Sequence, residues 1–143
     1  MQVDAASGDR HLNDGRVETF NPLFPNGYYF TLAGYTGYAN LIHVKPSITL
    51  KPSSKLALLF AVGFQWRMST NDAVYQQGSA VVPGTAGHGT AWTGAYAQIR
   101  ADWTVATNLI ASIEAVHFRV GDSIRELGGS NSDYVGLELK YGW

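Results

Sequence analysis

The residues of this sequence best suited to bind a solute are charged side chains that alternate with apolar ones. An arginine guanidinium is planar and permanently charged, so it can meet a carboxylate with two hydrogen bonds, whereas a lysine acts as a compact point charge. Such side chains could contact a polar or anionic solute if the strands that carry them line a pore. The candidate residues are Lys45, Arg67, Arg100, Asp102, Glu138 and Lys140.

Catalytic motifs are weak. Ser7, Asp9 and His11 are close in sequence, but catalytic triads are defined by geometry, and no G-x-S-x-G elbow occurs. The glycine-rich residues 84–89 lack the Lys-Ser/Thr and the helix of a phosphate loop. We expect no catalytic residue and no cofactor, and an enzyme is the least favoured reading.

Metal-binding patterns are equally weak. The histidines show neither H-x-x-x-H nor H-E-x-x-H spacing, and the acidic loop residues lack EF-hand spacing for calcium. We expect solvated loops and no metal site. The residues concerned are His11, His43, His88 and His117, and Asp9, Asp14, Asp72, Asp122 and Asp133.

Composition narrows the classes further. The 143 residues include 16 Gly, 13% aromatic and only 15% charged residues, no Cys, and a net charge of -1. Without a Lys/Arg cluster, nucleic-acid binding is not expected. No apolar run approaches the roughly 18 residues of a membrane-spanning helix, and residues 1–10 lack the apolar core of a signal peptide.

The hydrophobic pattern has period two, which predicts β-strands. Pro46 cannot donate to a ladder and predicts a bulge or a strand end. The run 109–120 changes phase near Val116, which indicates a bulge or a strand leaving the sheet. The expected strands are residues 42–50, 56–68, 95–103, 109–120 and 134–143, with a further strand end at 2–5.

The connections alternate in length. Those near Pro52 and Ala106 are short turns, whereas residues 8–38, 69–91 and 121–133 are long and rich in glycine and polar or aromatic residues. The strands of a soluble sandwich or lipocalin-like barrel would also show alternating apolar and polar residues. However, the face opposite Phe60, Phe64 and Trp66 is too small and polar for an apolar core, and aromatic residues gather near strand ends. These features predict an antiparallel transmembrane β-barrel, with short periplasmic turns and long external loops.

The C-terminal strand carries the most specific local pattern. Leu137, Leu139, Tyr141 and Trp143 place apolar residues at alternate positions and an aromatic at the last one. This pattern resembles the signal by which the barrel-assembly machinery recognises outer-membrane barrels. An ordinary amphipathic strand is the alternative.

Longer motifs resemble the alginate export family of Gram-negative outer-membrane porin-like barrels, and they cover nearly the whole chain in the order of the C-terminal part of such proteins. The motif Phe-Asn-Pro-Leu-Phe-Pro at residues 20–25 and the segment 64–67 are the most specific. The matching pieces are residues 6–9, 20–25, 40–42 and 64–67, then Asp72, Tyr75, Phe118, Gly121, Asp122 and the terminal strand.

The resemblance implies a porin or exporter in the bacterial outer membrane that passes a polar or anionic solute, such as an alginate-like polysaccharide, through a charged lumen. Arg67 is the favoured selectivity residue, so Arg67→Glu is predicted to shift the permeability ratio of anions to cations. The alternatives are mutual pairing of the lumen charges, a non-conducting structural or adhesin-like barrel whose loop aromatics bind sugars or plug the lumen, and a barrel-embedded hydrolase.

The expected partners are outer-membrane lipid, the barrel-assembly machinery and the solute. Five strands are too few to close a barrel, since single-chain barrels begin at about eight. We therefore expect the chain to be the C-terminal part of a barrel, which further upstream strands or another chain would complete.

Overall fold

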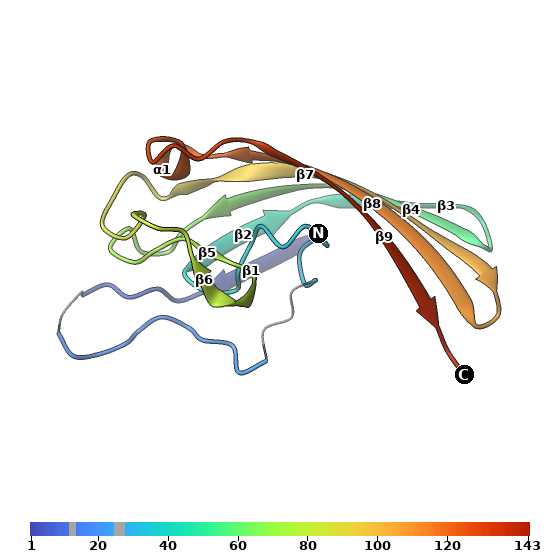
Figure 1. Cartoon of the computed structure of the whole chain (residues 1–143), viewed down its shortest axis with the longest axis horizontal. Coiled ribbons are helices and arrows are strands. Elements are labelled where there is room, and N and C mark those ends of the chain that lie inside the picture. The colour runs from blue at the N-terminus through green and yellow to red at the C-terminus, as the bar shows by residue number, and fades with distance from the viewer. Residues whose placement is uncertain (12–13, 25–27) are drawn as a thin grey trace.

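The computed structural model describes residues 1–11, 14–24 and 28–143, and most of the regular structure is one twisted antiparallel sheet (Figure 1). The strand order is β1-β2-β4-β7-β8-β9, and β3 pairs with β4 beyond the end of β2. The strands are β1 (Gln2–Ala6), β2 (Leu41–Lys45), β3 (Ser47–Ser53), β4 (Leu56–Trp66), β7 (Trp92–Ala106), β8 (Leu109–Val120) and β9 (Ser132–Tyr141).

The all-β antiparallel fold predicted from the sequence is confirmed. Among the described residues, each of β1 and β9 has one neighbouring strand, so the sheet is open rather than a closed barrel. No helix in the described part of the chain has the length and apolar character needed to cross a membrane.

Neither Pro46 nor the change of phase near Val116 corresponds to a β-bulge. Pairing keeps one register on both sides of Pro46, from Val44 opposite Phe64 to Ile48 opposite Phe60. No residue is inserted; Pro46 interrupts the ladder because it has no N–H. Strand β8 likewise pairs with β7 without a shift from Val120 to Ile110, so the predicted bulge in this strand is wrong.

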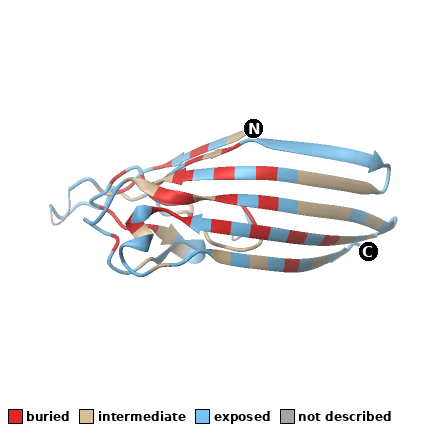
Figure 2. Cartoon of the chain, turned by 90° about the horizontal axis from the view of Figure 1, so that it is seen from above, coloured by how far each residue is buried: buried red, intermediate tan, exposed pale blue. Residues whose placement is uncertain are grey.

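All three long connections lie at one end of the sheet, and the short turns lie at the other (Figure 2). The connection 69–91 contains a small hairpin of β5 (Tyr75–Gln76) and β6 (Ala80–Val81) around the 3-10 turn η1 (Gln77–Ser79). The connection 121–133 contains the helical turn α1 (Asp122–Arg125) and reaches into β9. That the long connections are external and the turns periplasmic stays a prediction.

The two faces of the sheet have opposite character. Buried and exposed residues alternate along the strands (Figure 2). The outer face exposes large apolar side chains, whereas the inner face buries polar and charged ones. Such an inversion suits a wall with lipid outside and polar groups inside. The outer set includes Ile42, Ile48, Leu50, Phe60, Val62, Phe64, Ile99, Trp103, Ile113, Val135, Leu137, Leu139 and Tyr141, and the inner set includes Asp4, His43, Lys45, Gln65, Gln98, Ser112 and Glu114.

Residues 28–38 fold onto the inner face beneath the arch of the sheet (Figure 1). The Phe30 ring lies edge-on to His43 at 4.6 Å, and Tyr35 packs against Phe118 at 5.3 Å. Of the loop aromatics, Phe30 is buried and Tyr28 is 64% exposed. This docking explains the phase change in β8, because Val116 and its neighbours face inward and form an apolar cluster with Tyr96 that Ala33 and Tyr35 cover.

Gly63 on β4 leaves room for the Tyr96 ring, which lies across it from the paired position on β7. A Cβ at position 63 would overlap the ring and its hydroxyl. We therefore expect Gly63→Ala to destabilise the folded sheet by about 1–3 kcal/mol through overpacking. Urea unfolding of the lipid-reconstituted protein measures this; Gly142→Ala is the control, since nothing lies within 4 Å of that position, and equal losses for both variants would contradict the packing argument.

Candidate functional site

The inner face carries three groups of hydrogen-bonded polar side chains, which follow one another along the strands from the long loops towards the short turns. The first group joins three strands. His43 Nδ1 lies 3.0 Å from Asp4 Oδ2, and His43 Nε2 lies 3.0 Å from the Tyr96 hydroxyl. His43 is fully buried and its ring stacks parallel to that of Tyr96. The group links side chains of β1, β2 and β7.

The second group holds the inward segment. Lys45 Nζ donates to the Phe30 carbonyl at 2.7 Å, and the Leu32 amide donates to Glu114 Oε1 at 2.6 Å. The other oxygen of Glu114 accepts from Gln98 Nε2 at 2.8 Å. A buried lysine and a buried glutamate thus fasten the backbone of residues 30–32 to the sheet.

The third group lies nearer the short turns and centres on Arg100. Its guanidinium lies 2.9 Å from Asp102, 2.7 Å from Glu138 and 3.5 Å from Glu114. Ser112 donates to Asp102 at 2.6 Å, and Lys140 lies 3.3 Å from Glu138. Two cations, Arg100 and Lys140, therefore lie among three carboxylates, and Arg100 contacts all three of them.

The predicted site residues fall into two places. Lys45, Arg100, Asp102, Glu138 and Lys140 lie on the inner face and belong to the groups just described. The charges of the Arg100 group pair with one another, which was one of the alternatives in the sequence analysis. Whether these residues act on a solute stays a prediction.

Arg67 lies apart, one residue beyond the end of β4, and only 2% of it is exposed. Its guanidinium donates to backbone carbonyls of the connection that follows, namely those of Asp72, Thr85, His88 and Thr90. These bonds use both terminal nitrogens and Nε. The sequence-based role of Arg67 as a lumen-facing selectivity residue therefore has no support from its position, and the side chain instead organises residues 67–90.

Asp72 and Asn40 complete this loop scaffold. Asp72 accepts from the Asp9 amide, the Thr19 hydroxyl and the Tyr75 hydroxyl. Burial raises the pKa of Tyr75, and its bond to Asp72 raises that pKa further, so the hydroxyl stays protonated at neutral pH. Asn40 has a left-handed backbone with φ 45 and bonds the backbone of Ser69 and Ala73. Two of the long connections are thus tied together.

Asp4, Gln98 and Glu114 belong to these groups but were not among the predicted site residues, and His43 was considered only as a weak metal ligand. The alternation along the strands predicts the positions of Gln98 and Glu114. Gln98 lies on the same face of its strand as Arg100, and Glu114 lies on the face opposite to the apolar Ile113. In the described part of the chain no group of three or more His, Asp and Glu side chains is placed to hold a metal ion.

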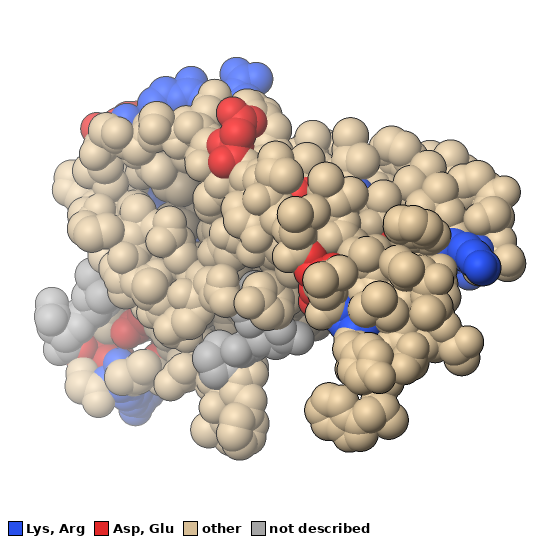
Figure 3. Space-filling view, turned by 45° about the vertical axis from the view of Figure 1, so that its right-hand side comes forward, with Lys and Arg blue, Asp and Glu red and all other residues tan. Residues whose placement is uncertain are grey.

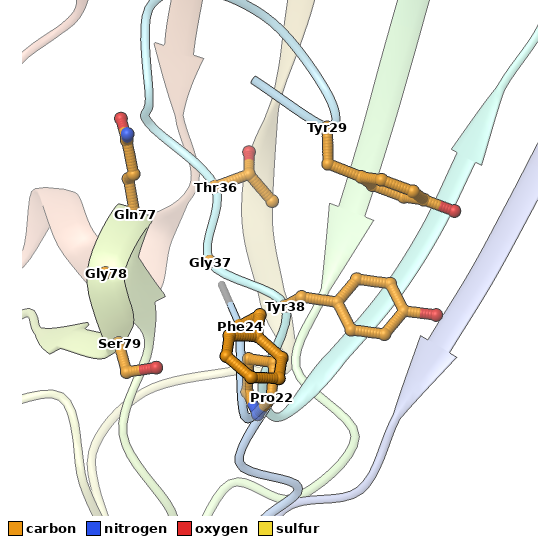
Figure 4. Close-up of a pocket in the computed structure, with 9 residues that line it drawn as sticks. All are labelled: Pro22, Phe24, Tyr29, Thr36, Gly37, Tyr38, Gln77, Gly78 and Ser79. Atoms are coloured by element: carbon orange, nitrogen blue, oxygen red, sulfur yellow. The ribbon is translucent and has the colours of Figure 1, made fainter. Parts of the chain in front are cut away.

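A separate hollow of about 250 Å³ lies at the long-loop end (Figure 4). The rings of Tyr29 and Tyr38 lie on one side of it, and Gln77, Gly78 and Ser79 of η1 lie on the other (Figure 4). Tyr29 also donates to Asp4 at 3.0 Å, so this hollow adjoins the first polar group.

The proposed assembly signal lies on the outer side of β9. Leu137, Leu139 and Tyr141 are all exposed there, and Trp143 follows the end of the strand. Recognition of these residues by the assembly machinery stays a prediction. Charged residues occupy only a small part of the face seen in Figure 3.

A charge on this side of β9 should be unfavourable in lipid. We expect Leu139→Lys to cost about 1–3 kcal/mol of stability in bilayers, because the penalty for lysine falls from the midplane towards the interface. Folding equilibria in lipid vesicles measure it, with Leu139→Met as the control. A loss of similar size in the Met variant would point to packing rather than to lipid.

The polarity of the two faces, the antiparallel pairing and the segregation of long loops from short turns define the class: the chain is part of an outer-membrane-type β-barrel wall. The chain matches the family model described as alginate export over residues 1–138, and it belongs to that family. This is a transport family rather than a class of enzymes. No curated protein and no solved structure matches the chain.

Proposed function

We propose that the chain forms part of the wall of an outer-membrane channel that conducts a polar, sugar-like solute along its inner face. The observation that carries this proposal is the row of mostly buried polar and charged side chains on the inner face, opposite an apolar outer face. The polar inner face of such a wall can contact water and a polar solute, and its apolar outer face can contact lipid. Further strands, from the same polypeptide or another chain, would close the barrel.

Planar bilayers test the proposal. The full-length protein should form open channels whose selectivity between K⁺ and Cl⁻ is weak, because the inner-face cations Lys45, Arg100 and Lys140 offset the carboxylates of Asp102, Glu114 and Glu138. Reversal potentials in a KCl gradient measure this. A protein that inserts and folds but never conducts would refute the channel, and strong anion selectivity would favour an anionic polysaccharide of the alginate type, which family membership makes the second candidate solute.

The aromatic hollow of Figure 4 supports a second candidate function, a barrel with sugar-binding loops. Tyrosine rings beside polar side chains suit the stacking of a sugar. Sugar binding that is lost in Tyr38→Ala, in a protein that forms no channels, would favour this function over transport.

A further inference from the structure

A second pocket, of about 260 Å³, lies between the inward segment and the middle of the inner face. Tyr28, Phe30 and Leu32 line it from the segment, while Gln98 and Arg100 line it from β7. It is therefore enclosed by loop on one side and by the predicted conduit wall on the other.

The cations around this pocket are already engaged. Arg100 lies within ion-pair distance of three carboxylates, and Lys45 donates to the Phe30 carbonyl. Lys140 is paired with Glu138. An anionic solute entering here would have to displace one of these partners and would also approach the carboxylates of Glu114 and Glu138.

One polar atom in the pocket wall lacks a partner. Gln98 is 3% exposed, and its Nε2 donates to Glu114. Because a carboxylate can only accept, the amide nitrogen must face Glu114, which leaves Gln98 Oε1 as the acceptor atom of this amide. Among the described residues, Oε1 is the buried side-chain polar atom for which no hydrogen-bond partner is found. Buried acceptors are normally satisfied, so this atom calls for a donor.

We propose that this pocket binds a neutral, hydroxyl-rich sugar unit, one hydroxyl of which donates to Gln98 Oε1. The exposed ring of Tyr28 at the pocket supplies an aromatic surface of the kind sugars stack on. The inference rests on the proposed channel and specifies its solute class: donors of hydrogen bonds are favoured over carboxylates.

Calorimetric titration of the full-length protein in detergent tests the site, with maltotriose as the neutral probe and trigalacturonate as the anionic one. Maltotriose should bind the unaltered protein more tightly. Gln98→Met should weaken maltotriose binding about five- to tenfold, the effect of one hydrogen bond. Gln65→Met is the control, because Gln65 is a buried glutamine of the inner face that bonds Thr36 outside this pocket.

A second variant guards against misfolding of the first. Gln98→Lys keeps a donor for Glu114 but removes the acceptor, so it should lose maltotriose affinity to a similar extent. Tighter binding of trigalacturonate by the unaltered protein, or unchanged maltotriose affinity in Gln98→Lys, would overturn the proposal. Bilayer recordings separate the two failures: binding without conductance removes the channel but keeps the site, and conductance without maltotriose binding removes the site alone.

Discussion

Arg67→Met is expected to loosen the connection of residues 67–91 and to destabilise the fold at the long-loop end. The guanidinium is buried and donates to four backbone carbonyls of this connection. The bonds to Asp72 and Thr85 are buried and those to His88 and Thr90 are part-buried, and the Thr85 carbonyl also accepts from the His88 amide. Because a buried carbonyl that loses its donor costs about 1–3 kcal/mol, the total should be about 2–4 kcal/mol. Methionine fills similar space but supplies no donor.

Limited proteolysis of the folded protein in detergent measures this, because cleavage reports local opening. New cleavage sites should appear within residues 69–91, located by mass spectrometry. Arg119→Met is the matched control, since Arg119 is an exposed arginine on the outer face of β8. If Arg67→Met resists the protease like the parent while its reversal potential shifts, Arg67 acts on permeating ions after all and the scaffold role is wrong.

The position of Arg67 also indicates how far alternation can carry a prediction. The period-two pattern predicted where the strands lie and which face of each is apolar. It could do so because a face that contacts lipid requires an apolar residue at every second position. It failed one residue beyond β4, where Arg67 continues the pattern in sequence although the chain has left the sheet. The position of the Arg67 side chain is then determined by hydrogen bonds to backbone carbonyls up to 23 residues away in the sequence.

The motifs that carried the family resemblance lie mainly in the loop scaffold. Asn40, Arg67, Asp72 and Tyr75 bond loop backbone or one another, and none of them belongs to the Arg100 group. Their spacing in sequence indicates the family but not these contacts, which join segments far apart in the chain. The docking of residues 28–38 onto the inner face could not be predicted from the sequence either. The segment has no hydrophobic periodicity, and its aromatic residues are compatible with both an exposed and an inward arrangement.

Releasing residues 28–38 from the inner face is expected to widen the conduit. Two bonds to charged side chains hold residues 30–32 of this segment, one from Lys45 to the Phe30 carbonyl and one from the Leu32 amide to Glu114, whereas residues 34–37 have separate bonds to Tyr75, Gln77, Ser132 and Gln65. At about 1.5–3 kcal/mol each, the two bonds to charged side chains supply roughly 3–6 kcal/mol of docking free energy, enough to change residues 30–32 from almost always docked to often released. The double variant Lys45→Met with Glu114→Leu should therefore conduct several-fold more current per channel.

Thiol labelling gives an independent measure of release. The chain has no cysteine, so a single Thr31→Cys reports on the segment, and Thr31 is buried in the docked state. In the double variant, this thiol should react much faster with a water-soluble maleimide. Lys140→Met is the matched control, because it removes an inner-face lysine whose ion pair is with Glu138 rather than with the segment.

The conservative pair Lys45→Arg and Glu114→Gln separates docking from charge. Arginine still offers a donor to the Phe30 carbonyl, and glutamine still offers an oxygen to the Leu32 amide, so both should keep low conductance and slow labelling. If Glu114→Gln alone opens the channel, the charge beside Arg100 controls conductance instead of the segment. If the double variant labels fast but conducts as the parent does, the segment leaves the wall without forming the narrowest part of the conduit. Only joint changes in labelling and current are consistent with an internal constriction whose residues 30–32 are held by one lysine and one glutamate.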